Sequence, residues 1–241
     1  MEKSTKKFYA FFEFLHSYFN KELFEGLLPN SLMVISRKPK SFGYFYPERW
    51  ESKEGAKLDE IALNPTYFDR LPLLEILQTM AHEMCHQWQY HYGEKKSQRN
   101  YHNKEWASKM IEIGLMPSDT GKEGGNIVGQ SIMEYPIAKG LFLKTCNKLV
   151  NHKKFNMTFF DRIIKEKELE ALEELNQREE LKGLNINPLL LEKPSIQDKI
   201  VVQTPSSSTG KYFCETCNSS LWGKKGLSII CGTCGNPFVR I

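Results

Sequence analysis

The feature that most constrains this fold is a pair of histidines four residues apart inside a long helical pattern. Residues 72–92 repeat apolar side chains at helical spacing, and His82 and His86 lie in the middle of that pattern. Two residues four apart on a helix differ by about 40° in direction, so both imidazoles leave one face and can bind one metal ion. We therefore expect a helix over residues 72–92 that stops at Gly93.

Glu83 belongs to the same His-Glu-x-x-His motif and suggests a catalytic metal. Zinc suits neutral imidazole ligands, and it both activates water and polarises a peptide carbonyl. From its place on the helix Glu83 cannot be a ligand, but it can act as general base on that water. Such a short motif recurs by chance, yet its amphipathic setting favours the metal site here.

A third metal ligand is needed, and two residues compete for the role. His102 follows a short turn and stands just before a second helix expected over residues 103–113, so the chain can return it to the metal. Glu105 is the rival, because some zinc peptidases take a glutamate from the next helix. Glu105 could instead interact favourably with the helix dipole, or it could hydrogen-bond to a residue that binds the metal without binding the metal itself. We favour His102 because it stands at the helix start.

Two other interpretations of the motif are excluded. Gln89 and Tyr92 occupy the positions where a metzincin has glycine and histidine, so the chain does not belong to that class. His91 lies five residues past His86 and faces away from it on a helix, which makes it a poor third ligand.

The remaining residues of the first 160 predict a mixed α+β domain. Residues 8–19 have helical spacing, and Glu13 and His16 interrupt their apolar run without a cleavage site behind them, so we expect a helix of the mature fold. The glycine-rich residues 117–140 predict ordered loop with short strand. Strands are expected at residues 32–36, 42–46 and 58–64.

Four cysteines near the C-terminus predict a second, different metal site. They form two C-x-x-C pairs: Cys214, Cys217, Cys231 and Cys234. Without a secretory signal, this pattern indicates a Cys₄ zinc ribbon, with a hairpin expected at residues 219–222 and 227–230. A closed shell of four thiolates has no open position, so this zinc is structural. Two zinc ions per chain follow, and Cys85 and Cys146 are expected to be buried spectators.

Charge and composition divide the chain further. The net charge of +4 is mild, but residues 161–210 carry 7 basic and 10 acidic groups and lie between two basic parts. We expect a charged helix over residues 161–182 and then a flexible linker rich in proline, serine and threonine. No apolar run reaches the about 18 residues of a membrane span. In the ribbon, nucleic acid could be contacted by Trp222, Lys224, Lys225, Tyr212 and Arg240. These residues could equally form a hairpin's core and solvated tip.

With these motifs the sequence resembles the SprT-like zinc metallopeptidases, which are related to the spartan proteases. The resemblance covers roughly residues 8–142 and the terminal module. It starts with a Phe-Asn…Leu-Phe-x-Gly-x-Leu-Pro segment at residues 19–29 and continues with His-Glu-Met-Cys-His at residues 82–86. It includes His102-x-x-x-Trp106, where the family commonly has phenylalanine instead of tryptophan, and a Pro-Ser-x-Thr-Gly…Gly-Gly…Gly-Gln segment at residues 117–130.

The resemblance implies a function and assigns the site residues. In the family the matching histidines bind zinc and the matching glutamate is the catalytic base, which supports His102 over Glu105 and carries over to His82, His86 and Glu83. It implies a zincin-like core made of an N-terminal helix, a small sheet, the motif helix and the helix after it. It further implies a soluble endopeptidase that acts on DNA-associated proteins, including proteins crosslinked to DNA.

We therefore expect a SprT-like domain at residues 1–160, a connector at residues 161–210 and a ribbon at residues 211–241. The expected location is cytoplasmic, with protein substrates, DNA as a partner of the ribbon, and no membrane. The strand at residues 58–64 is expected to be the edge that pairs with an extended substrate. The alternative is a nucleic-acid-binding or regulatory zinc protein with a structural or weakly active motif, although a structural site would not need Glu83.

Overall fold

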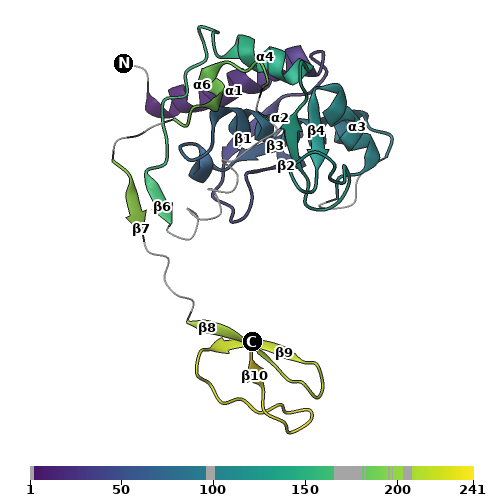
Figure 1. The fold of residues 1–241 in the computed structure, drawn as a ribbon, viewed down its shortest axis with the longest axis vertical. Helices are drawn as coiled ribbons and strands as arrows, with labels where there is room; N and C mark the ends of the chain where they lie inside the picture. The colour runs from purple at the N-terminus through teal and green to yellow at the C-terminus, as the bar shows by residue number, and fades with distance from the viewer. Residues whose placement is uncertain are drawn as a thin grey trace. The chain divides into compact units, whose positions relative to one another are not determined.

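A computed structural model describes residues 3–95, 101–165, 181, 183–194, 196, 198–202 and 208–241. The chain forms two compact units, Met1–Val201 and Val202–Ile241 (Figure 1). The larger unit combines helices with small sheets, so the predicted α+β class is confirmed. No helix in these described ranges has both the length and the apolarity needed to cross a bilayer.

The elements of the larger unit follow the predicted order, with additions at its C-terminal side. Its helices are α1 (Ser4–Leu23), the 3₁₀ turn η1 (Pro65–Tyr67), α2 (Leu73–Tyr92), α3 (Lys104–Glu112), α4 (Leu141–Leu149) and α6 (Pro188–Leu191). Its strands are β1 (Ser31–Ile35), β2 (Gly43–Glu51), β3 (Lys57–Leu63), β4 (Leu115–Ser118), β5 (Met133–Pro136), β6 (Ile163–Lys165) and β7 (Ile200–Val202).

The main sheet has the order β1-β3-β2, with β3 parallel to β1 and antiparallel to β2. The strand at residues 58–64, expected to be the edge, is therefore central, and that prediction is wrong. Strand order depends on which segments pair across the molecule, and the local pattern of a strand carries little information about that. Of the strands described in this sheet, β2 is the edge on the other side from β1.

Helix α2 covers one face of this sheet. Alternation along the strands places Met33, Ile61 and Phe45 in one register row toward the helix. On α2 the predicted apolar stripe is fully buried at Leu74, Leu77, Ala81 and Met84, and its last member, Trp88, is partly buried. Burying this stripe against the sheet holds the middle of α2, where the histidine motif lies, in a fixed place.

A buried polar network also fixes α2 in register with the sheet. The Gln87 side chain, fully buried, donates to the backbone carbonyl of Pro29 at 3.0 Å, to Ser31 Oγ at 2.7 Å and to Asp59 Oδ2 at 3.0 Å. Its Oε1 lies 3.1 Å from Nε2 of His16 on α1. Because a buried amide without partners is costly, this network favours one position of the helix along its axis.

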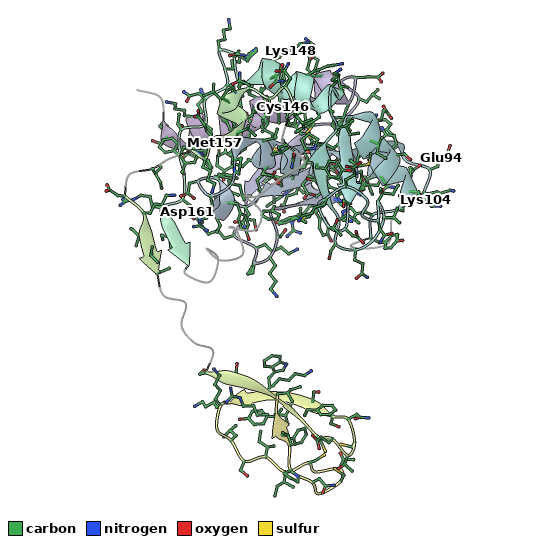
Figure 2. All side chains as sticks on the ribbon, in the orientation of Figure 1. Glu94, Lys104, Cys146, Lys148, Met157 and Asp161 are labelled. Carbon is green, nitrogen blue, oxygen red and sulfur yellow. The ribbon has the colours of Figure 1, made fainter. Side chains whose placement is uncertain are left out.

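The glycine-rich segment after α3 contains a strand pair. β4 and β5 are antiparallel, with Pro117 opposite Glu134 and Ser118 opposite Met133. Short strands were predicted there, but the α4 helix that follows Gly140 was not. Cys146 on α4, labelled in Figure 2, is fully buried, and so is Cys85 on α2, as expected for spectators.

Part of the expected connector packs on the larger unit. Where the sequence predicts a helix over residues 161–182, residues 163–165 form β6, paired with β7, and residues 166–180 lie outside the described ranges. Leu190 of α6 is fully buried, and the carbonyl of Glu192 accepts a hydrogen bond from the N–H of Leu73 at the start of α2. Apolar residues in a proline-rich segment thus anchor it to the core.

The smaller unit is a three-stranded sheet with the order β10-β8-β9, made of β8 (Thr209–Phe213), β9 (Ser220–Lys224) and β10 (Val239–Arg240). Residues 219–222 and 227–230 were expected to pair as a hairpin, and that prediction is wrong, because β9 pairs with β8 instead. Residues 209 and 210 therefore belong to a strand, not to the flexible linker.

Candidate functional site

The structure brings His82, His86 and His102 together. Nε2 of His102 lies 3.1 Å from Nε2 of His82 and 3.2 Å from Nε2 of His86. Zinc–nitrogen bonds of about 2.0–2.1 Å in a tetrahedral arrangement separate ligand nitrogens by about 3.3 Å. Both distances are close to that spacing, and the three histidines offer ring nitrogens that all lie within 4.8 Å of one another. The group could therefore bind one zinc ion and leave a fourth position for water or substrate.

Glu105, the rival third ligand, has another role in the structure. Its carboxylate accepts hydrogen bonds from the N–H of Glu94 at 2.7 Å, the N–H of Lys95 at 3.1 Å and the side chain of Gln89 at 3.2 Å. Figure 2 labels Glu94 and Lys104, which lie together at the outer edge of the unit. Glu105 therefore ties the turn after α2 to the start of α3, which helps to return His102 to the motif.

Two of the three histidines have polar partners at Nδ1, the ring nitrogen that does not face the other histidines. Nδ1 of His82 lies 2.9 Å from Oε2 of Glu134 on β5, and Nδ1 of His102 lies 3.1 Å from the carbonyl oxygen of Gly129. With Nδ1 engaged, Nε2 is the nitrogen that faces the other imidazoles and is available to bind a metal. Glu134 was not found from the sequence, because a lone acidic residue in a non-periodic segment gives no signal of contact with a distant helix.

The indole ring of Trp106 packs against all three histidines of the cluster. It is fully buried, and its ring centroid lies 4.3 to 5.2 Å from the centroids of the three imidazoles. The ring stacks on His86 with an angle of 23° between their planes. Packing against a rigid indole limits the rotamers that the histidines can adopt, so it preorganises their nitrogens.

Burial around the site favours neutral imidazoles, the form that binds metal. Burial lowers the pKa of His86 well below its usual value and lowers that of His102 to about 4, in both cases with help from the charge of His82. Burial also opposes the charge on His82, but the Glu134 carboxylate outweighs it and the pKa of His82 is raised.

Glu83 lies beside the cluster, next to the edge strand β2. Burial raises its pKa to about 7, although the charge of His82 and a hydrogen bond from the backbone N–H of Phe45 oppose that rise. The close approach of β2 needs glycine at position 43, since an added Cβ would lie 2.8 Å from the Ala62 carbonyl and 3.1 Å from Glu83 Oε1. The arrangement holds the Glu83 carboxyl group beside His82, in the lining of the same cleft as His82 and His102.

A cleft of about 440 Å³ opens in front of these groups. Most of the residues that line it come from the start of β2, from α2 and from residues 130–134. The lining includes Phe42, Leu71, Ile132, Met133, His82, Glu83, His102 and Glu134. The mixture of apolar walls and converging polar groups is typical of a binding site for a substrate segment.

The four predicted cysteine ligands also converge, in the smaller unit. Their sulfurs lie within 4.8 Å of one another, and two of the pairs, Cys214–Cys234 and Cys217–Cys231, are 3.4 Å apart. Tetrahedral zinc–sulfur bonds of about 2.3 Å imply a separation of about 3.8 Å, slightly longer than observed, whereas a disulfide needs about 2.05 Å. Backbone N–H groups of Cys234 and Thr233 lower the pKa of the Cys231 thiol to about 6. Against a backbone N–H of Asn236, the neighbouring cysteine side chains raise the pKa of Cys234 to about 11, because the four thiols crowd together.

Of the residues suggested for nucleic-acid contact, Trp222, Lys224 and Lys225 lie on and beside β9, and Arg240 lies on β10. Tyr212 of β8 is only 2% exposed and its hydroxyl donates to the Lys224 carbonyl, so it belongs to the ribbon's core and that suggestion is wrong. Trp222 is 72% exposed, which argues against a role in the ribbon's core. Lys211 stands directly opposite it on β8, and Lys224 lies two residues further on the same face. Lys225 is exposed just after the strand, where its N–H bonds to the Ser208 carbonyl. Lys211 was not among the residues suggested from the sequence, because its pairing with Trp222 is a matter of register.

A comparison with protein families found a match to part of the chain. Residues 12–123 match the SprT-like family, so the resemblance noted in the sequence is confirmed over that segment. The matched segment includes the three histidines and Glu83, and the family is generally linked to metallopeptidase function. Comparisons with curated proteins and with solved structures found no match.

Proposed function

Taking residues 12–123 as a SprT-like domain, we propose that this chain is a zinc-dependent endopeptidase that acts on DNA-associated proteins. The observation that carries the proposal is the spacing of 3.1 and 3.2 Å between Nε2 of His102 and Nε2 of His82 and His86, with Glu83 beside them. A second zinc in the Cys₄ ribbon would be structural. The expected content is two zinc ions per chain.

The proposed chemistry assigns separate roles to the chain's own residues. Zinc, when bound, supplies the Lewis acid that activates water and polarises the scissile carbonyl. His82, His86 and His102 would hold it with neutral imidazoles. Glu83 accepts a proton from the attacking water and later donates it to the amine that leaves.

The edge strand β2 is the proposed support for an extended substrate. The Phe42 carbonyl accepts from the N–H of Asn64 on the β3 side, so alternation turns the polar groups of Gly43 and Phe45 away from β3. One of these, the N–H of Phe45, already reaches Glu83. A substrate strand added at this edge would run along the cleft and bring its peptide groups to the metal position.

The DNA-associated part of the proposal rests on the family resemblance and on the ribbon. A highly exposed tryptophan flanked by Lys211 and Lys224 offers a ring for base stacking and cations for phosphates. Zinc with four thiolates carries a charge of about −2, which offsets part of the ribbon's basic charge and limits its phosphate contacts to a few. The ribbon would deliver the peptidase to its substrates and take no part in hydrolysis.

The test is hydrolysis of an unstructured protein by the zinc-loaded full chain, measured with and without DNA. The proposal predicts cleavage that depends on zinc and increases when DNA is present. DNA binding without any cleavage would instead favour the alternative, a nucleic-acid-binding or regulatory protein with a structural motif. If the rate of cleavage is the same with and without DNA, the peptidase activity is supported and the proposed role of DNA is contradicted.

A further inference from the structure

A single short strap of chain, residues 129–134, contacts two of the three candidate metal ligands. At one end Gly129 exchanges two backbone hydrogen bonds with His102, of 2.7 and 3.1 Å, and its carbonyl also lies 3.1 Å from the His102 ring. At the other end Glu134 lies 2.9 Å from Nδ1 of His82. The strap lies beyond residues 12–123, so the family match assigns it no role.

The position of Glu134 is set by the fold. Glu134 is in the middle of β5 and pairs with Pro117 of β4, which itself packs against α3. Its side chain is only 9% exposed, and that of His82 is 14% exposed. A carboxylate held this way can select one tautomer and one orientation of the imidazole, because its oxygen accepts the Nδ1–H and leaves the Nε2 lone pair free.

We propose that Glu134 is a positioning residue for the metal site, acting through His82, and that the strap 129–134 couples metal binding to the substrate cleft. The coupling follows from the residues between its two ends. Gln130, Ser131, Ile132 and Met133 all line the cleft, so a substrate pressed against them contacts the segment that holds His82 and His102. A ligand that stabilises the strap in this position should also tighten the metal, since linkage is reciprocal.

The proposal rests on the histidine metal site of the proposed function, but its test does not need activity. Apo full-length protein is titrated with zinc against a competing chelator and with cobalt(II), whose visible absorption distinguishes histidine from thiolate ligands. The component of binding that His102→Ala removes is assigned to the histidine site. If wild-type protein lacks this component, the proposed function itself fails; an inactive protein that retains it still allows Glu134 to be tested.

Three variants distinguish the positioning of His82 by Glu134 from a general effect of losing one negative charge and from a loss of the folded state. Glu134→Ala is expected to weaken zinc at the histidine site by about 10–100-fold, the usual effect of losing an outer partner of a ligand. Glu134→Gln should give an intermediate loss with a changed cobalt spectrum, because the amide can still accept a hydrogen bond but lacks the charge. Glu123→Gln, at an exposed position in the same connection between β4 and β5, removes one charge as a control and should bind like wild type.

Unfolding of each apo variant by urea shows whether the fold is retained. Weakened zinc binding with a wild-type unfolding midpoint supports the positioning role. Wild-type zinc affinity in Glu134→Ala overturns it, as does a loss that Glu123→Gln reproduces. If Glu134→Ala does not fold, the comparison moves to Glu134→Gln, whose wild-type affinity and cobalt spectrum would overturn the proposal in the same way.

Discussion

At the scale of single residues, the site depends on a few side chains whose partners leave little freedom. Glu105 and His102 stand three residues apart, yet one ties down a turn and the other joins the histidine cluster. The difference comes from direction: His102 precedes α3 and is fixed by Gly129, whereas Glu105 is in its first turn and faces the end of α2. Substitutions at these two positions should therefore have different effects.

His102→Ala is expected to remove zinc from the histidine site, since it deletes one of three ligands. Glu105→Ala should leave that zinc in place and lower stability by about 0.5–1.5 kcal/mol, because the N–H groups of the turn lose this acceptor but are exposed and can bond to water instead. Metal analysis after anaerobic purification, together with urea unfolding, measures both effects. Loss of this zinc in Glu105→Ala with retention in His102→Ala would reverse the assignment.

His16 gives a pH dependence of stability with a definite sign. Burial lowers its pKa in the folded state, against the opposing effects of Gln87 and Asp59, so below about pH 6.5 the unfolded chain binds more protons than the folded one. The contribution of His16 to the free energy of unfolding is therefore fully present above that pH. It is lost as the pH falls toward the lowered pKa of His16 in the folded state, by at most about 1.4 kcal/mol per pH unit.

His16→Gln, which keeps an amide near Gln87, should reduce this acid loss. Urea unfolding of apo wild type and variant at pH 7 and pH 5.5 isolates His16, because the other histidines are common to both. An equal decrease in stability in the two proteins would mean that His16 does not contribute.

At the scale of elements, β2 and α2 have to approach closely for Glu83 to face the cleft. Gly43→Ala places a methyl group against the Ala62 carbonyl, Thr79 and Glu83, and should cost about 10²-fold in hydrolysis by displacing the base while the histidines retain zinc. Gly55→Ala is the control: it is strained at a φ of 84° but meets nothing within 4 Å, so it should lower stability without changing the rate per folded molecule. Equal rates in the two variants would contradict the role given to β2.

Local patterns predicted the elements that carry the motif, and non-local pairing decided the rest. Helix α2 was predicted because its apolar spacing and its stop at Gly93 are properties of adjacent residues. The central position of β3 in the sheet and the contact between Glu134 and His82 were not predicted, because both depend on contacts between residues that lie far apart in the chain. The short helix α6 was missed because its proline-rich surroundings have the composition of a linker.

At the scale of the whole molecule, the two units separate the proposed hydrolysis from the proposed delivery. A chain ending at Val202 should keep zinc at the histidines and basal hydrolysis, and lose stimulation by DNA. A chain ending at Asn187 should be less stable by at least about 2 kcal/mol, because it lacks the buried Leu190 and the Glu192 carbonyl that bonds to Leu73.

The salt dependence of DNA binding measures how many of the phosphate contacts come from the ribbon. With few cations beside Trp222, its contribution to the slope should equal about two or three phosphate contacts. Equal DNA affinity and equal stimulation in the full chain and in the chain ending at Val202 would show that the ribbon serves another purpose, such as binding a protein partner.

The most direct test of the central claim is the rate of peptide hydrolysis by Glu83→Gln beside wild type, each with its metal content measured. The amide has nearly the shape of the carboxylate but cannot accept a proton at neutral pH. We expect an unchanged zinc content and a rate lower by roughly 10²–10⁴-fold or more. Undiminished hydrolysis by a zinc-loaded Glu83→Gln protein would contradict it.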